Sequence, residues 1–310
     1  MPITVLLGPQ RLQPTIAAVA DQLGLTGRVA LVTAGWQELE SADAELREHL
    51  GTGVVNLGLY RRAEEVFGDD PELAEAHRER QDRLRALQSL HRVRLRHTLD
   101  AARQLMGRQG KGEDLEEERE AALRQLSDLD TTHAERLKAL HRAWDDQVGL
   151  ATRPSIARHR AEVAELMAGV SVLAVAGGHV VVVLNRLRLF DVVGQWGDGP
   201  LIAWSAGAMA LARRVFVYHD NPPQGPANAE VLETGLGRYR SVQPFPHAKR
   251  RLRLDDQVRT SVLARRVAPA DAVPLDEGEW VALDGDRVTS HQGGRRLTAD
   301  GSVTPLEQLR

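Results

Sequence analysis

The 310-residue chain contains no cysteine. This absence excludes disulfide bonds, cysteine nucleophiles and metal sites built from thiolates. No apolar run approaches the roughly 20 residues that a membrane-spanning helix needs. Residues 1–8 carry no basic segment ahead of their short apolar run. We therefore expect no signal peptide and a cytoplasmic protein.

The chain also lacks an excess of basic charge, because its formal net charge is -3. Domains that bind nucleic acid usually present a basic surface to the phosphate backbone. We therefore expect no nucleic-acid partner and, without a spanning segment, no membrane partner. The sequence suggests no metal site and no cofactor.

Short apolar runs alternate with helix-like segments at both ends of the chain. In the first part, strands are predicted at 3–7, 28–33 and 54–57, and helices at 14–23 and 38–50. From residue 154 onward, helices are predicted at 155–167, 180–189 and 254–264, a loop at 221–226, and strands at 170–175, 201–204, 214–218, 272–275, 279–283, 287–290, 295–298 and 302–305. Strands that are continuous apolar runs are typical of a parallel sheet covered on both sides. We predict an α/β core over 1–58 and 154–310: a doubly wound, mostly parallel sheet with helices on both faces.

The alternation stops between these two parts. Over 64–148, apolar residues recur every three or four positions among many charged residues, and a glycine-rich stretch at 107–114 divides the segment. This pattern predicts two long helices in an antiparallel hairpin, inserted as residues 59–153, with a stripe like a coiled-coil seam. His91 and His133 lie on that stripe, and we interpret them as seam residues. Since two helices hide such a stripe incompletely, we expect the hairpin to project from the core and to pack against a second copy of the chain.

One serine stands where a nucleophile would be presented. Leu201-Ile202-Ala203-Trp204 predicts a strand, Ser205 follows, and Ala206-Gly207-Ala208 opens a helix. A serine at a sharp strand-to-helix turn is lifted out of the sheet, where its hydroxyl can attack a carbonyl. The alternative is an ordinary serine N-cap, which is common at such junctions.

Acyl transfer by serine also needs a base, an orienting acid and donors for the oxyanion. Gly177-Gly178 ends a predicted strand, where paired glycines would let backbone N–H groups approach a substrate oxygen. The base candidates are His219, His247 and His291, with His247 placed in a loop before a helix. The acid candidates are Asp276 and Glu277, with Glu230 and Glu233, before the His247 loop, as the alternative if neither acts. Each of these residues, taken alone, also fits a structural role.

Four segments, in this order, resemble motifs of the peptidase E and cyanophycinase family of serine peptidases. They are Gly177-Gly178, Trp204-Ser205-Ala206-Gly207-Ala208, His247 with the basic residues 249–251, and Leu275-Asp276-Glu277-Gly278-Glu279-Trp280. The resemblance implies a class I glutamine amidotransferase-like fold over 1–58 and 154–310. The chain departs from the family pattern at Ala203, His179 and Ala248, which bears on substrate specificity more than on acyl chemistry.

The resemblance also implies roles for single residues. Ser205 would be the nucleophile, His247 the base and Glu277 the orienting acid. Gly178 and Ala206 would donate to the oxyanion, and Gly177, His179 and Trp204 would contact substrate. Neighbouring residues of an extended segment point to opposite sides, so we expect only one acid, Glu277 rather than Asp276, to face the site.

Two functions follow as hypotheses. The first is a serine hydrolase that cleaves small peptides or amide bonds through an acyl-enzyme on Ser205. The second is a catalytically degenerate peptidase-like scaffold whose helical hairpin mediates protein binding or oligomerisation.

Overall fold

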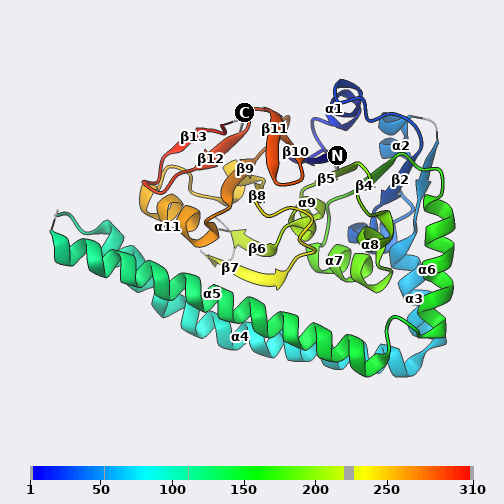
Figure 1. Ribbon diagram of the computed structural model, residues 1–310, viewed down its shortest axis with the longest axis horizontal. Coiled ribbons are helices and arrows are strands. Elements are labelled where there is room, and N and C mark those ends of the chain that lie inside the picture. Colours follow the sequence, from blue (N-terminus) through cyan, green and yellow to red (C-terminus); the bar gives the residue numbers. More distant parts are fainter. Residues whose placement is uncertain (1–2, 52, 111, 220–226, 308–310) are drawn as a thin grey trace.

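The computed structural model describes residues 3–51, 53–110, 112–219 and 227–307. Its centre is a seven-stranded sheet with the order β11-β10-β1-β5-β4-β2-β3 (Figure 1). The strands are β1 (Ile3–Leu7), β2 (Val29–Val32), β3 (Val54–Asn56), β4 (Val172–Val175), β5 (Leu201–Trp204), β10 (Trp280–Asp284) and β11 (Arg287–Gln292). The five strands from β1 to β3 in this order pair in parallel, and β10 and β11 add an antiparallel edge. The mostly parallel α/β sheet predicted from the sequence is therefore present.

Both faces of this sheet are covered. Along β2, Val29 and Leu31 pack into one apolar cluster, whereas Ala30 and Val32 pack into another. This alternation is expected because successive side chains of a strand point to opposite faces. On the first face lie α1 (Ile16–Gln22) and α2 (Ala44–Leu50); on the second lie α3 (Leu59–Asp69), α6 (Pro154–Met167), α7 (Val180–Leu189), α8 (Val192–Trp196) and α9 (Ala206–Leu211).

The helix predicted over 38–50 is wrong in its first part. The chain instead forms a 3-10 turn, η1 (Ala34–Leu39), and then α2. The side chains of Thr33 and Asn56 donate to the Glu40 carbonyl at 2.8 and 3.2 Å. These bonds to a neighbouring strand hold residue 40 outside a regular helix, which local periodicity cannot reveal.

A second sheet, with the order β13-β12-β9-β8, lies beside the first. It comprises β8 (Val242–Pro246), β9 (Asp271–Leu275), β12 (Arg295–Leu297) and β13 (Val303–Pro305), next to α11 (Gln257–Val267). The sequence predicted a loop before His247, but residues 242–246 form β8. This strand lies at the edge of its sheet. Pro244 and Pro246 have no N–H to donate, and an edge strand tolerates this because one of its sides has no partner strand.

The third sheet is a two-stranded antiparallel ribbon of β6 (Arg214–His219) and β7 (Ala227–Thr234). The predicted loop at 221–226 lies outside the described residues.

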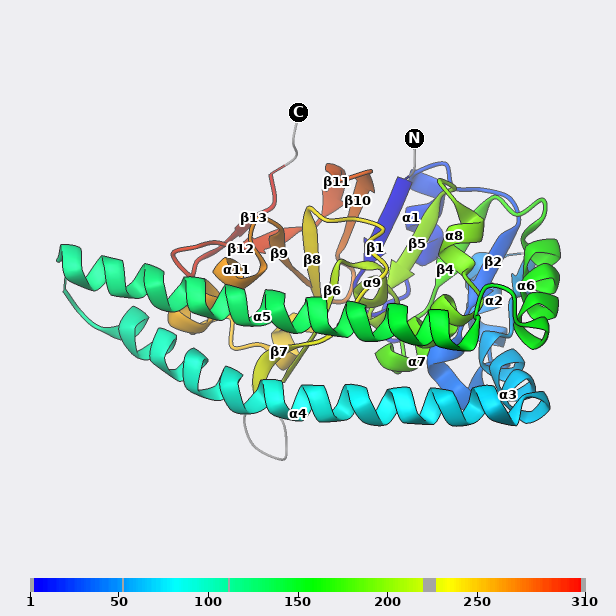
Figure 2. The ribbon, with the colours of Figure 1, turned by 60° about the horizontal axis from the view of Figure 1, so that its bottom comes forward.

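The inserted segment contains two long antiparallel helices, α4 (Pro71–Gly107) and α5 (Glu113–Val148). Figures 1 and 2 show both helices running along one side of the core, with the end nearest residue 110 extending past α11. Leu95, Leu99 and Leu126 form an apolar cluster with Val262 of α11. The expectation of a hairpin that projects from the core is therefore wrong for most of its length, because its apolar stripe is covered by the chain's own core.

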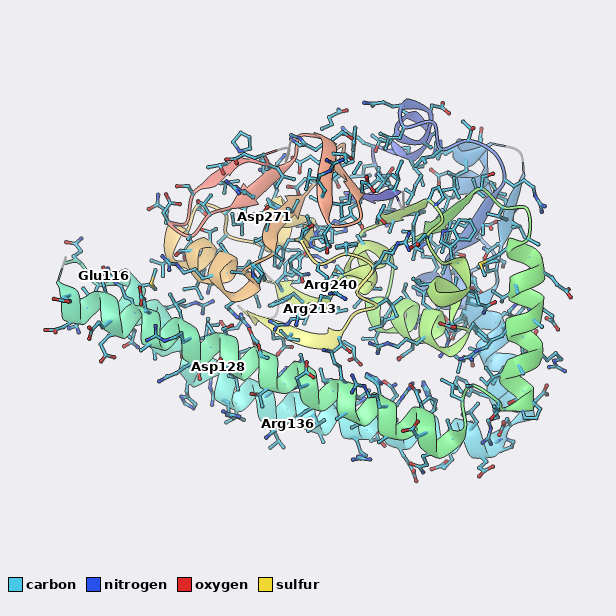
Figure 3. All side chains as sticks on the ribbon, in the orientation of Figure 1. Glu116, Asp128, Arg136, Arg213, Arg240 and Asp271 are labelled. Carbon is cyan, nitrogen blue, oxygen red and sulfur yellow. The ribbon has the colours of Figure 1, made fainter. Side chains whose placement is uncertain are left out.

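Polar contacts reinforce this docking. Arg266 of α11 donates twice to the Asp130 carboxylate of α5, at 2.8 and 2.9 Å, and both side chains are fully buried. His91 and His133 stack with ring centroids 4.0 Å apart, as seam residues. The outer faces of the pair carry charged side chains, among them Glu116, Asp128 and Arg136 (Figure 3). No helix in the described part of the chain is long and apolar enough to cross a membrane.

Candidate functional site

Ser205 stands at the turn between β5 and α9. Its backbone has φ 49° and ψ -120°, a left-handed conformation that non-glycine residues rarely adopt. β5 is the middle strand between β1 and β4, so the turn opens at the carboxyl edge of the parallel sheet. The side chain of Ser205 is partly buried and lines a cavity of about 920 Å³. The structure therefore presents this hydroxyl at a strained turn.

The glycine pair after β4 lies against this turn. A Cβ atom on Gly177 would come within 2.8 Å of the Ser205 Cβ, so only glycine fits there. Gly178 has φ +114°, and its Cβ would clash with the Gly35 carbonyl at 2.4 Å. No described backbone carbonyl accepts a hydrogen bond from the Gly178 N–H. The N–H of Ala206, the first residue of α9, has no acceptor within its own helix.

His247 reaches Ser205 from the second sheet. It follows β8 with φ 58° and ψ 35°, and its N–H donates to the Leu275 carbonyl at 2.9 Å. The Ser205 Oγ and His247 Nε2 atoms are 3.4 Å apart. A nucleophile and its base are usually about 2.6–3.2 Å apart, and the distance is often longer without substrate. Ser205 follows β5 of the first sheet and His247 follows β8 of the second, so two neighbouring sheets bring the two residues together.

Burial lowers the pKa of His247 below 6.5, and the cations Arg251 and Arg250 lower it further. The carboxylates of Glu277 and Asp276 act in the opposite direction. The lowered pKa favours the neutral imidazole at pH 7, which is the form that can accept a proton.

The two candidate acids have different surroundings. Asp276 is buried; it accepts from the Lys249 N–H at 3.0 Å and from Arg295 at 3.0 Å. Glu277 is exposed. Within the described residues, neither carboxylate hydrogen bonds to His247, although Glu277 influences its pKa more than Asp276 does. The role of Glu277 as orienting acid stays a prediction.

The other predicted residues fall into two groups. Trp204, Gly177, Gly178, Ala206 and His219 line the cavity. His179 lies outside the lining and caps α7, where its Nδ1 accepts from the Val182 N–H at 3.4 Å. His291 is bound to the Leu306 carbonyl at 2.9 Å on β11, also outside the lining.

No sequence pattern predicts a role for Tyr218, and Glu230 is predicted only as an alternative acid. The Tyr218 hydroxyl donates to the Pro246 carbonyl at 2.5 Å, directly before His247, and supports that backbone. Glu230 of β7 lines the cavity. Its carboxylate accepts hydrogen bonds from Nε and Nη2 of Arg92, on α4, at 2.6 to 3.0 Å. Arg251, one turn after His247, was noted only as part of a basic segment. Tyr218 and Glu230 come from the β6–β7 ribbon, whose place in the fold no local pattern indicates.

Among the described residues, no group of three His, Asp or Glu side chains could hold a metal ion. Comparison with known protein families finds no family model that matches the chain, and no curated protein matches it either.

Proposed function

We propose that this chain is a serine hydrolase that cleaves small peptides or amides through an acyl-enzyme on Ser205. The observation that carries the proposal is the 3.4 Å approach of the Ser205 Oγ to His247 Nε2, with Ser205 in a left-handed strand-to-helix turn. A serine used only as an N-cap has no need of this backbone, and its side chain does not cap α9 here. The cavity of about 920 Å³ is large enough for a short peptide.

In this mechanism, the Ser205 Oγ attacks the scissile carbonyl carbon as its proton passes to His247 Nε2. The negative oxygen of the tetrahedral intermediate accepts hydrogen bonds from the Gly178 and Ala206 N–H groups. His247 then gives the proton to the leaving amine, and the C–N bond breaks. Water, deprotonated by His247, cleaves the acyl-serine ester and releases the acid.

Within this proposal the core is doubly wound and the chain is related to the peptidase E and cyanophycinase family, as the four motifs indicate. Glu277 orients His247, by its charge or after a shift in the presence of substrate. The protein acts in the cytoplasm on small peptides. Residues of the core and of β7 line the cavity at Ser205, and no described residue of α4 or α5 does.

A fluorophosphonate probe tests the proposal directly, since it phosphonylates activated serines. We expect labelling at one site, mapped to Ser205 by mass spectrometry, in the native chain and in Ser41→Ala, whose serine is exposed. Ser205→Ala and His247→Ala should both lose it, and the double variant should be no worse. Absence of labelling in the folded native chain would reject the hydrolase and favour the scaffold. A peptide-library screen would then define the substrate.

A further inference from the structure

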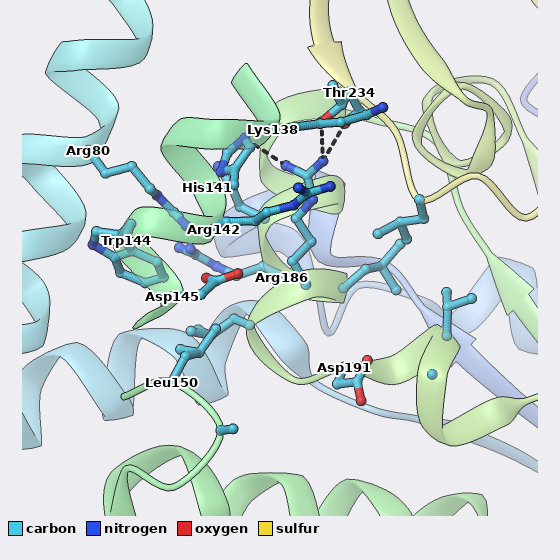
Figure 4. A pocket seen from close by; sticks show the side chains of 18 of the residues that line it. Arg80, Lys138, His141, Arg142, Trp144, Asp145, Leu150, Arg186, Asp191 and Thr234 are labelled. Atoms are coloured by element: carbon cyan, nitrogen blue, oxygen red, sulfur yellow. Dashed lines mark hydrogen bonds between the residues drawn. The ribbon is translucent and has the colours of Figure 1, made fainter. Parts of the chain in front are cut away.

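A second cavity, of about 740 Å³, lies between the helix pair and the core (Figure 4). Its walls come from α4, α5, α6, α7 and α8, and from Thr234 at the end of β7. It shares no described lining residue with the cavity at Ser205. The function proposed above makes no use of it.

The lining of this cavity is rich in fixed positive charge. Its described residues include six arginines and lysines (Arg80, Lys138, Arg142, Arg160, Arg186, Arg188) and three aspartates (Asp145, Asp146, Asp191). Lys138 and Arg142 are one turn apart on α5, an arrangement in which like charges repel. Lys138 also pairs with the exposed Glu135 of the same helix at 2.7 Å. The labelled arginines in Figure 4 approach the space from three different helices.

Some of these cations already have partners. Arg186 pairs with Glu64 at 3.0 Å, and Arg160 donates to the Leu189 carbonyl. Arg188 donates to Thr234, contacts His141 at 3.1 Å and lies 3.7 Å from Glu233. These residues fix the wall of the cavity.

Arg80 is different. It is only 6% exposed, and its guanidinium stacks on the Trp144 ring at 3.8 Å. Its Nε has no hydrogen-bond partner. Among the described residues, the carboxylates that act on its charge are Asp145 and Glu233, and neither forms an ion pair with it. Burial, together with Arg188 and Arg186, lowers the pKa of Arg80 to about 10, which Asp145 and Glu233 offset only in part. A buried cation in this condition lacks a counterion.

The available acids do not supply one. Asp145 is largely exposed at the rim, and the partial burial of its carboxylate raises its pKa. Asp146 and Asp191 are also exposed. Glu233 is buried, but its carboxylate lies 2.8 Å from His141 and 3.7 Å from Arg188. The positive charge at the centre of the cavity is therefore not neutralised by the protein, and an anionic ligand would neutralise it.

We propose that this cavity binds the phosphate groups of a small phosphorylated metabolite, held by Arg80, Lys138 and Arg142. Arginine suits this role because its planar guanidinium donates two parallel hydrogen bonds to phosphate oxygens. A carboxylate offers two oxygens in one plane, whereas phosphate offers three that can face donors on separate helices. The volume exceeds that of phosphate alone, so the rest of the metabolite also fits.

Such a ligand would join α4 and α5 of the helix pair across their positively charged side. Binding should therefore also stabilise the folded chain, since a ligand that binds only the native state raises its stability.

Titration calorimetry with inorganic pyrophosphate and with ATP tests the site, with citrate as a multivalent anion lacking phosphate. We expect saturable binding that weakens as salt concentration rises. Arg142→Glu should weaken it by about tenfold or more, because a charge-assisted contact becomes a repulsion. Arg136→Glu makes the same charge change on α5 outside the cavity and should bind as the native chain does. Arg80→Met should also lose binding; if it fails to fold, Arg142→Glu still decides.

Tighter binding of ATP than of pyrophosphate would identify the metabolite as a nucleotide, and equal binding would indicate recognition of the phosphates alone. Three results would overturn the proposal: no saturable binding of either phosphate probe, equal binding by Arg142→Glu and the native chain, or citrate binding as tight as pyrophosphate.

Discussion

Two of the described non-glycine residues with positive φ are Ser205 and His247, the residues 3.4 Å apart in the candidate site. A non-glycine residue in such a conformation costs on the order of 1–3 kcal/mol and persists only where its surroundings hold it there. For Ser205 the surroundings are β5, α9 and the glycine pair. For His247 they are the Leu275 carbonyl and the Pro246 carbonyl held by Tyr218. The two strained positions thus meet where the proposed chemistry takes place.

The pH dependence of Ser205 labelling reports on His247. Because burial and Arg251 lower the pKa of the imidazole, its neutral, basic form is lost only below pH 6.5. The labelling rate should rise with pH through one ionisation below 6.5 and then stay level. Glu277→Gln removes a carboxylate that raises this pKa, so the rise should move to lower pH. Glu116→Gln, at the far end of α5, is the control. If Glu277→Gln has the same pH profile as the native chain, Glu277 does not act on His247.

Asp276 should behave as a structural residue. Asp276→Asn loses the charge that pairs with Arg295 at 3.0 Å but keeps an oxygen for the Lys249 N–H. We expect a loss of about 1–3 kcal/mol in unfolding free energy, measured by urea denaturation. The exposed Glu277→Gln should change stability little. If Asp276→Asn unfolds normally but no longer labels with fluorophosphonate, Asp276 is the orienting acid instead.

At the scale of elements, the sequence predicts best where local pattern and tertiary structure agree. The helix at 180–189 and the strand at 201–204 have the predicted bounds. The helix was predicted because the chain must cross back over the sheet between two parallel strands, and the strand because it is a continuous apolar run. β8 was missed since its two prolines are acceptable only at a sheet edge. Ser205 and the glycine pair could be found from sequence, because a sharp turn restricts residue types. The cavity at Arg80 could not, because it depends on how α4 and α5 meet α7.

The attachment of α5 to α11 depends on the buried pair of Asp130 and Arg266. Arg266→Met should cost about 3–5 kcal/mol of unfolding free energy, since it leaves a carboxylate buried without a counterion. Replacing both residues, in Arg266→Met with Asp130→Leu, should recover much of that loss. Arg265→Met, its exposed neighbour on α11, is the matched control. Equal losses in the single and double variants, by urea denaturation, would contradict this account.

Considered as a whole molecule, the chain has little apolar surface left for a partner on its helix pair. Trp144 and Val148 of α5 belong to the main core cluster. Removing the helices would therefore expose core residues and would not give a clean test of assembly. Two large apolar side chains remain exposed on α4: Leu90, at 66%, and Val93, at 54%.

If the chain assembles through its helix pair, as the sequence suggested, Leu90 and Val93 should lie in the interface. We expect the native chain to elute as an oligomer in light-scattering chromatography, and Leu90→Glu with Val93→Glu to elute with the monomer mass. Leu12→Glu, at a still more exposed leucine before α1, should not change the mass. A native chain that is already monomeric would exclude the assembly role.

The two ends of the helix pair are fastened together at its base. Arg153, just before α6, donates to both carboxylate oxygens of Asp70, just before α4, at 2.6 and 2.7 Å, and Ser155 donates to the same carboxylate. β2 lies before the helix pair in the sequence and β4 after it, and the two strands pair in parallel from Val29–Val172 onward. Loop-closure entropy grows only as the logarithm of loop length, by about 0.6 kcal/mol for each doubling. Because Arg153 and Asp70 hold the two ends of the helix pair together, the pair acts as a short connection once it has formed. The chain entropy lost when β2 pairs with β4 is then little larger than it would be without the insertion.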